Sequence, residues 1–91
     1  MTNKQKKLMI IGSSWEQIPL IKKAKELGCH VLGTDPDEYA EGFKFVDQFE
    51  VVSPRDLERL HRIALNYNPD ANTADECDYS HFATVYISER L

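Results

Sequence analysis

The chain has 91 residues, of which 42% are hydrophobic and 29% charged, and this composition is typical of one small globular domain rather than of a disordered chain. The net charge is −4 at pH 7, and the basic residues are interleaved with acids, which argues against nucleic acid as a partner. No apolar run approaches the roughly 20 residues of a membrane helix, and residues 8–11 are too short a run for a signal peptide. We therefore expect one domain over residues 1–91, located in the cytoplasm.

The first third of the chain predicts a strand, a helix and a second strand. Residues 7–11 form a continuous apolar run that ends at Gly12, as expected for a parallel strand buried on both faces. Residues 15–27 have apolar positions at helical spacing and are followed by Gly28, a candidate left-handed cap. Residues 29–34 predict the second strand. The expected buried face of the helix comprises Ile18, Ile21, Ala24 and Leu27.

The start of this helix is ambiguous. Ser14 followed by Gln17 matches a capping box. However, Pro19 would then lie inside the helix, where it lacks an N–H group and crowds the preceding turn. We leave the start open between Ser14 and Gln17.

The middle of the chain predicts a loop, a strand and a second helix. Residues 35–44 carry turn signals and allow one helical turn, and residues 48–52 predict a short strand near a sheet edge. Ser53 is the expected N-cap of the next helix, with Pro54 at its first position and Pro69 ending it. Its expected buried face comprises Leu57, Leu60, Ala64 and Tyr67.

The last part predicts a fourth strand over residues 71–74, although Asn72 and Thr73 are unusual in a buried strand. A helix is expected after it, with apolar residues at helical spacing from Tyr79 to Ile87. The resulting order, β-α-β-β-α-β-α, predicts an α/β fold with a mainly parallel four-stranded sheet in the order 3-2-1-4. Such sheets bind ligands at the carboxyl ends of their strands, here between strands one and four.

The corner after the first strand is the first candidate site. Gly12 permits a tight turn, and the free N–H groups of the following helix can hold a phosphate or a carboxylate. Ser13 and Ser14 would add hydroxyl groups. The alternative is that Ser14 only caps the helix.

Asp35 is the second candidate. It follows Gly12 by about 20 positions, where a dinucleotide-binding fold places the acid that holds a ribose hydroxyl. The corner nevertheless lacks the further glycines of that motif, and Trp15 would crowd the pyrophosphate. We therefore favour Asp35 as the residue that starts an Asp-Pro turn.

The third candidate is the acidic segment after the fourth strand. If the strand order holds, Asp75 and Asp78 face the Gly12 corner and could bind a cationic or hydroxyl-bearing ligand. Glu76 is expected to be solvated, and Asp78 or Ser80 could instead cap the last helix.

A metal site and a catalytic pair are both disfavoured. Cys77, Asp78 and His81 could contribute ligands together with Cys29 and His30, but no closely spaced cysteine pair anchors a zinc site. We expect neither a metal site nor catalytic residues in this chain, and we expect reduced thiols.

These features together resemble a known family. The small-residue corner "GSS", the segment "KKAKELG", the "TDPD" that closes strand two, the later "FVDQF" and the "D…DYS" after strand four occur in this order over nearly the whole chain. In this order they are similar to the N-terminal, pre-ATP-grasp domain of ATP-grasp ligases, of the carbamoyl-phosphate-synthase-like and biotin-carboxylase-like branch. This resemblance implies a three-layer, half-Rossmann fold.

The resemblance also implies a function. Such ligases use ATP to join a carboxylate to an amine through an acyl phosphate, and their N-terminal domain forms a wall of the acceptor-substrate site. That substrate-binding role carries to Gly12, Ser13 and Ser14, and to Asp75 and Asp78. ATP and Mg²⁺ are expected in a separate ATP-grasp domain, and no cofactor is expected in this chain.

Two departures from the family pattern stand out: the corner contains fewer glycines, and strand four is less apolar. The apolar pattern of the last helix has no closing residue, so we expect a C-terminally truncated domain that is inactive alone and associates weakly with itself. The alternatives are a dinucleotide-binding fragment of an oxidoreductase and a non-catalytic interaction module that uses the last helix, for example Phe82 and Tyr86.

Overall fold

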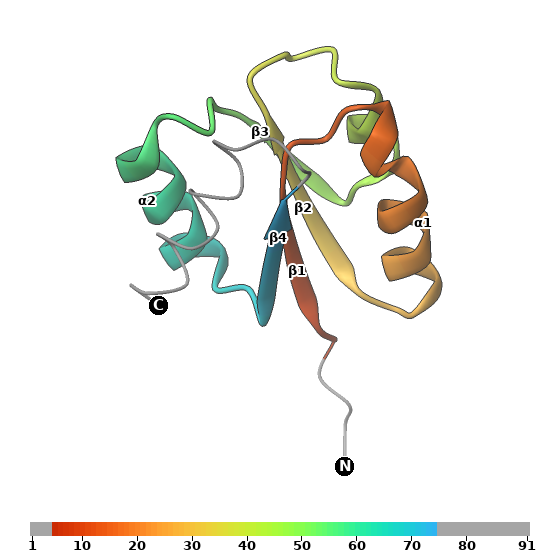
Figure 1. Cartoon of the computed structure of the whole chain (residues 1–91). Coiled ribbons are helices and arrows are strands. Elements are labelled where there is room, and N and C mark those ends of the chain that lie inside the picture. The colour runs from red at the N-terminus through yellow and green to blue at the C-terminus, as the bar shows by residue number, and fades with distance from the viewer. Residues whose placement is uncertain (1–4, 75–91) are drawn as a thin grey trace.

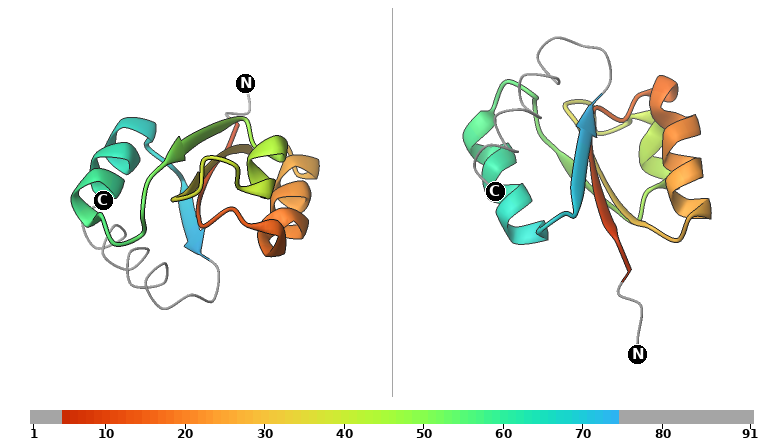
Figure 2. Two further views of the ribbon diagram at one scale, coloured as in Figure 1. Left: turned by 90° about the horizontal axis from the view of Figure 1, so that it is seen from above. Right: turned by 60° about the horizontal axis from the view of Figure 1, so that its bottom comes forward.

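The computed structural model describes residues 5–74, which form a three-layer α/β/α fold (Figure 1). Its four-stranded sheet is entirely parallel, with the order β3-β2-β1-β4. Helix α1 covers one face of the sheet and helix α2 covers the other, as both views in Figure 2 show. The predicted fold class and strand order are confirmed. The strands are β1 (Lys7–Ile11), β2 (His30–Asp35), β3 (Gln48–Val51) and β4 (Ala71–Ala74), and the helices are α1 (Ile18–Glu26) and α2 (Leu57–Tyr67).

Strand β1 supplies both halves of the core, because successive side chains of a strand point to opposite faces. Met9 and Ile11 pack on the α2 side, in a cluster with Leu32 and Leu60. Ile10 packs on the α1 side, in a second cluster whose buried members are Ile10, Ile21, Ala24 and Val31. The continuous apolar run at residues 8–11 of this strand is thus explained by a helix on each face of the sheet.

Helix α1 begins later than a capping box at Ser14 would require. Residues Trp15–Gln17 form a short 3₁₀ turn, η1, and the Ser14 side chain makes no capping hydrogen bond. Gln17 is the N-cap of α1, so Pro19 lies within the first two helical positions, where its missing N–H costs nothing. Of the starts left open between Ser14 and Gln17, the latest is therefore the observed one, because it places the proline in the first turn of the helix.

The end of α1 is partly as expected. Gly28, the residue directly after the C-cap, has φ +84° and ends the helix in the left-handed region, which confirms the prediction. Leu27 was expected on the buried face but is 72% exposed, because the helix ends at Glu26 and Leu27 is already the C-cap. Gln17 is buried instead.

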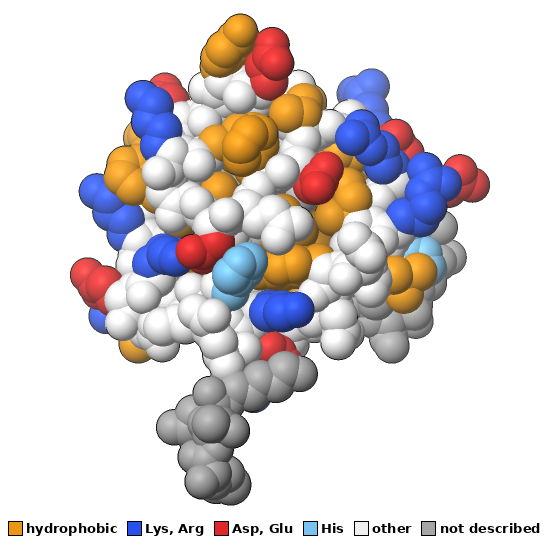
Figure 3. Space-filling model, turned by 180° about the vertical axis from the view of Figure 1, so that it is seen from behind, with side chains coloured by type: hydrophobic (Ala, Val, Ile, Leu, Met, Phe, Trp, Pro, Cys, Tyr) orange, Lys and Arg blue, Asp and Glu red, His pale blue; other side chains and the backbone are white. Residues whose placement is uncertain are grey.

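The segment between β2 and β3 contains the single helical turn that was predicted within a loop. It forms a 3₁₀ helix, η2 (Glu41–Phe45), against the α1 side of the sheet. Strand β3 then forms the sheet edge, as predicted, and Phe49 on it is about half exposed. Figure 3, which views the molecule from behind, shows hydrophobic side chains exposed between charged ones on this side.

Helix α2 begins later than the predicted N-cap at Ser53 would place it. Ser53 does not cap the helix; its Oγ accepts a hydrogen bond from the Arg55 N–H (3.1 Å), which closes a local turn. Asp56 is the N-cap, and its side chain accepts from the Arg59 N–H (3.2 Å). The predicted buried face is correct, since Leu60, Ala64 and Tyr67 are buried and Leu57 packs against them.

Strand β4 is formed despite its polar sequence. It pairs with β1 in parallel register, with Met9 opposite Asn72 and Ile11 opposite Ala74. The predicted last helix lies outside the described residues. Within the described part of the chain, neither helix has the length and apolarity that crossing a bilayer requires.

Candidate functional site

The candidate site lies at the carboxyl edge of the sheet, where β1, β2 and β4 all end. The loop of residues 12–14 follows β1, and Asp35 ends β2. Because Ile11 is paired with Ala74, the ends of β1 and β4 are side by side, as the predicted strand order requires. Asp75 and Asp78 lie outside the described residues, so their part in the site stays a prediction.

Gly12 makes the corner itself. Its φ of +91° is in the region that favours glycine. Its N–H donates to the Thr34 carbonyl at 2.8 Å, which extends the β1–β2 pairing into the loop. The corner therefore stays bonded to β2 through its first residue.

Ser13 is fully buried, and its polar groups are bonded within the chain. Its Oγ donates to the Thr34 carbonyl (3.1 Å), and its N–H donates to Asp35 Oδ2 (2.9 Å). Its carbonyl accepts from the Gly42 N–H at 2.8 Å. Ser13 was predicted as a substrate-binding residue; the structure places it beneath the loop surface, where it anchors the corner.

Two glycines outside the corner make this close packing possible. A Cβ on Gly42 would lie 2.5 Å from the Ser13 carbonyl oxygen, and a Cβ on Gly33 would lie 2.7 Å from the Ser13 Oγ. Sequence reasoning looked for glycines within the corner and missed these two. A glycine inside a strand, as at Gly33, is itself a signal of close approach by another segment.

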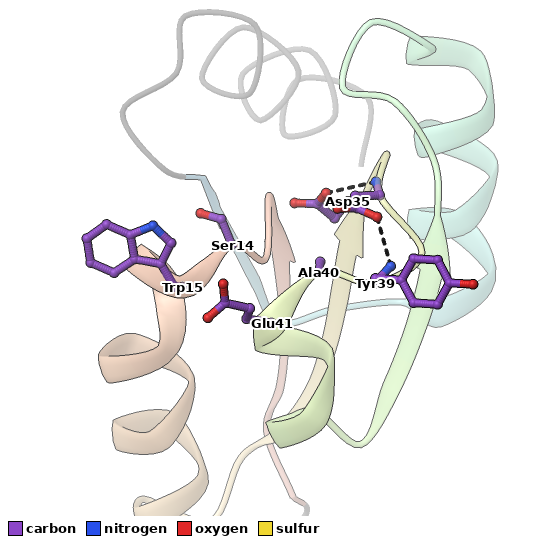
Figure 4. A pocket seen from close by; sticks show the side chains of 7 residues that line it. Ser14, Trp15, Asp35, Tyr39, Ala40 and Glu41 are labelled. Atoms are coloured by element: carbon purple, nitrogen blue, oxygen red, sulfur yellow. Dashed lines mark hydrogen bonds between the residues drawn. The ribbon is translucent and has the colours of Figure 1, made fainter.

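Asp35 links the corner to the loop that follows β2. Its Oδ1 accepts from the Asp37 N–H at 2.9 Å, which is the Asp-Pro turn favoured from the sequence (Figure 4). Its Oδ2 accepts from Ser13, as described above. Sequence reasoning did not foresee this second contact, because it depends on a residue in another loop.

A cavity of about 130 Å³ opens between these two loops (Figure 4). Three of its lining residues carry carboxylates, and the indole of Trp15 and the hydroxyl of Ser14 lie on the opposite wall from Tyr39. Such a lining favours an amine or a hydroxyl group, because negative charge repels anions and indole rings attract cations. The residues lining the cavity are Ser14, Trp15, Asp35, Asp37, Tyr39, Ala40 and Glu41.

The opposite, amino edge of the sheet carries a different polar cluster. The Tyr67 hydroxyl donates to the His30 carbonyl (3.0 Å) and lies 2.6 Å from His30 Nδ1, so the ring nitrogen donates to the hydroxyl. Burial, together with the nearby charges of Asp47, Cys29 and Asp70, raises the pKa of Tyr67 to about 12.

Asp47 is the second titrating group of the amino edge. Burial alone would raise the pKa of Asp47, but hydrogen bonds from Lys25 and from the Val31 N–H, with attraction to Lys25 and His30, hold it below its usual 3.8.

No metal site is formed by the residues that the structure describes. Within residues 5–74, no three His, Cys, Asp or Glu side chains group as ligands. Cys29 is a half-buried thiol outside any disulfide. Cys77, Asp78 and His81, the other ligands considered from the sequence, lie outside the described range.

Comparison with known proteins gives a sequence relative and several structural neighbours. No protein-family model matches the chain. A formate-dependent phosphoribosylglycinamide formyltransferase from a Synechococcus strain is 33% identical over 70 residues, which cover 77% of this chain and 18% of the relative. The chain thus spans about a fifth of the length of that protein.

Several solved structures have a fold similar to that of this chain. A phosphoribosylglycinamide synthetase from Anaerococcus prevotii has a TM-score of 0.83 at 23% identity, covering 96% of this chain and 22% of its own. An N5-carboxyaminoimidazole ribonucleotide synthetase from Thermotoga maritima has a TM-score of 0.80 at 22% identity, covering 94% of this chain and 23% of its own. At such identities these matches show a shared fold.

The same fold also occurs in an enzyme of another class. A UDP-glucose 4-epimerase from Thermotoga maritima has a TM-score of 0.65 at 17% identity and covers 79% of this chain and 24% of its own. The fold alone therefore does not separate a ligase domain from a dinucleotide-binding fragment of an oxidoreductase.

Proposed function

We propose that this chain forms the N-terminal, substrate-side domain of an ATP-dependent carboxylate–amine ligase of the ATP-grasp family, and its similarity in sequence and fold to part of the enzymes named above supports this. The observation that carries the proposal is the position of the corner. The loop of residues 12–14 and the end of β4 lie together at the carboxyl edge, where open α/β sheets bind their ligands.

In this proposal the corner residues have separate tasks. Ser14 lines the cavity and contacts the acceptor substrate, whereas Gly12 and Ser13 hold the loop in shape. Asp75 and Asp78 are proposed to complete the substrate wall. The substrate is a small carboxylate or amine, and the acidic lining of the cavity supports the amine.

The ATP chemistry is proposed to belong to a partner. ATP and Mg²⁺ would bind to an ATP-grasp domain in the same or a separate chain, so this chain is inactive alone. A cytoplasmic location, weak self-association and the carbamoyl-phosphate-synthase-like branch remain part of the proposal.

The experiment is a titration of the ¹⁵N-labelled chain with glycinamide and, separately, with formate, followed by amide NMR and Trp15 fluorescence. We expect saturable shifts at Ser14 and Trp15 with the amine. Glu41→Gln, which removes a carboxylate of the cavity, should weaken them. Glu38→Gln, which does not line this cavity, should not.

Two results would contradict the proposal. Calorimetry that detects micromolar binding of ATP by this chain would show that it needs no ATP-grasp partner. Equal effects of Glu41→Gln and Glu38→Gln would show that the amine responds to overall charge and not to the cavity.

The second candidate function is a dinucleotide-binding fragment of an oxidoreductase, which the fold similarity to the epimerase favours. It requires Asp35 to hold a ribose hydroxyl, although both oxygens of its carboxylate already accept backbone hydrogen bonds. Saturable quenching of Trp15 fluorescence by NAD would support this function over the ligase.

A further inference from the structure

The corner after β1 is bonded to a carboxylate of its own chain. A phosphate-binding corner between a strand and a helix offers free backbone N–H groups to the anion. Here the Ser13 N–H instead donates to Asp35 Oδ2 at 2.9 Å, from the end of the neighbouring strand. Ser13 is fully buried, so this N–H is covered as well as bonded.

We propose that Asp35 is a positioning residue whose carboxylate takes the place of an anion on the corner. It holds the loop of residues 12–14 in shape and keeps phosphate groups away from the Ser13 amide. Charge-assisted hydrogen bonds of this kind are about twice as strong as neutral ones, which suits a fixed anchor.

The rest of the corner agrees with this role. The other Asp35 oxygen accepts from the Asp37 N–H, so a single carboxylate joins the two loops that line the cavity. Ser13 is held from its other side by the Gly42 N–H. A phosphate approaching the Ser13 amide would have to displace Asp35 and lie near two further carboxylates, Asp37 and Glu41.

The proposal concerns the corner itself and does not rest on the proposed function. It nevertheless bears on the substrate, because the names of two relatives refer to phosphoribosylglycinamide, which carries a phosphate group. In this chain, a phosphate-bearing substrate would have to be held by groups other than the Ser13 amide.

The test compares two variants of the ¹⁵N-labelled chain that lose the same charge from the same cavity. Asp35→Asn removes the carboxylate that binds Ser13. Asp37→Asn is the matched control, because Asp37 accepts from the Tyr39 N–H and does not contact the corner. Amide hydrogen exchange of Ser13 is measured first, and inorganic phosphate is then titrated while the amides of residues 12–16 are followed.

In Asp35→Asn we expect Ser13 to exchange about tenfold faster, the effect of losing one charge-assisted hydrogen bond. We also expect saturable phosphate shifts at the corner in this variant, and in neither the unmodified chain nor Asp37→Asn. Phosphate binding to the unmodified corner, or equal responses of the two variants, would overturn the proposal.

Asp35→Glu keeps the test decisive if Asp35→Asn does not fold. This variant retains the charge but displaces the carboxylate by one methylene group. Ser13 should exchange faster while phosphate still fails to bind. Unchanged exchange at Ser13 would show that Asp35 does not hold the corner.

Discussion

At both edges of the sheet, carboxylates accept hydrogen bonds from backbone N–H groups: Asp35 at the carboxyl edge, and Asp70 and Asp47 at the amino edge. The two edges differ in how closely separate backbone segments approach each other. At the carboxyl edge, backbone groups of the corner are bonded by the Asp35 carboxylate and by the backbone of Gly42. At the amino edge, long side chains such as Tyr67 and Lys7 reach across from one element to another. The carboxyl edge therefore depends on a close backbone approach in addition to the Asp35 carboxylate, and the amino edge depends on side chains that bridge its elements.

This difference predicts how each edge fails. A close backbone approach tolerates no added atoms, so the carboxyl edge is sensitive to the smallest enlargement of a residue. A side-chain bond can be removed without a clash, so the amino edge should lose stability in smaller steps and with a dependence on pH.

The largest effect is expected from Gly42→Ala. The new Cβ would lie 2.5 Å from the Ser13 carbonyl oxygen and 3.0 Å from Ile21 Cδ1. Because the nearer atom belongs to the backbone, η2 has to move away and the bond to Ser13 is lost. We expect a loss of about 3 kcal/mol in the free energy of unfolding, measured by urea denaturation.

Gly28→Ala is the control for Gly42→Ala. Gly28 has a positive φ but no atom near the position of an added Cβ, so only backbone strain opposes the change. We expect a loss of about 1 kcal/mol. If both variants lost the same stability, close packing at the corner would not be the reason for Gly42.

A smaller effect is expected at the amino edge in alkali. The pKa of Tyr67 rises from 10.0 to about 12 on folding, so the folded state favours the neutral phenol. The stability from this group is fully present below pH 10 and is lost as the pH rises toward 12. We expect a loss of roughly 2 kcal/mol over this range, measured by urea denaturation at each pH.

Tyr67→Phe is the control for this pH dependence. It removes the phenol that bonds to His30, so it should cost about 1 kcal/mol at neutral pH. Its stability should then fall less steeply between pH 10 and 12 than that of the unmodified chain. An equally steep fall would assign the alkaline loss to other groups, such as the lysines.

The smallest effect is expected from Lys25→Gln. Lys25 pairs with Asp47 near the surface, and such pairs contribute at most about 1 kcal/mol. The pKa of Asp47 lies below 3.8, so the stability it contributes is present above pH 3.8 and is lost as the pH falls through the lowered value.

Lys25→Gln should bring the pKa of Asp47 closer to 3.8, as followed by NMR titration of its carboxyl group. Lys23→Gln, which removes an exposed pairing with Glu26, should leave Asp47 unchanged. A pKa of Asp47 that does not respond to Lys25→Gln would contradict the assigned cause.

The sequence predicted the elements well and their first residues poorly. The run at residues 7–11, the edge position of β3 and the cap at Gly28 all follow from local pattern, and all are confirmed. The start of α2 was placed too early, because Ser53 is a good cap locally but Asp56 takes that place in the fold. Asp56 makes the capping bond of this helix by accepting from the Arg59 N–H, whereas Ser53 bonds only the Arg55 N–H of the turn before it. The start of α1 was left open, and Gln17, the last of the candidates, is its N-cap.

For the candidate site, the sequence identified the location but not the internal arrangement. Gly12, Ser13 and Ser14 lie at the predicted edge, and the turn formed by Asp35 is confirmed. The bond between Asp35 and Ser13 was not predicted, because it joins residues from two loops and leaves no periodic pattern in the chain.

The sequence by itself determined the fold class and the order of the strands. A strand with four consecutive apolar residues, as at residues 8–11, must be covered on both faces, and alternating helices and strands supply the cover. Only the tertiary structure decided which groups of the corner remain open to a ligand. That depends on which distant segments, here Asp35 and Gly42, arrive close enough to bond the Ser13 backbone first.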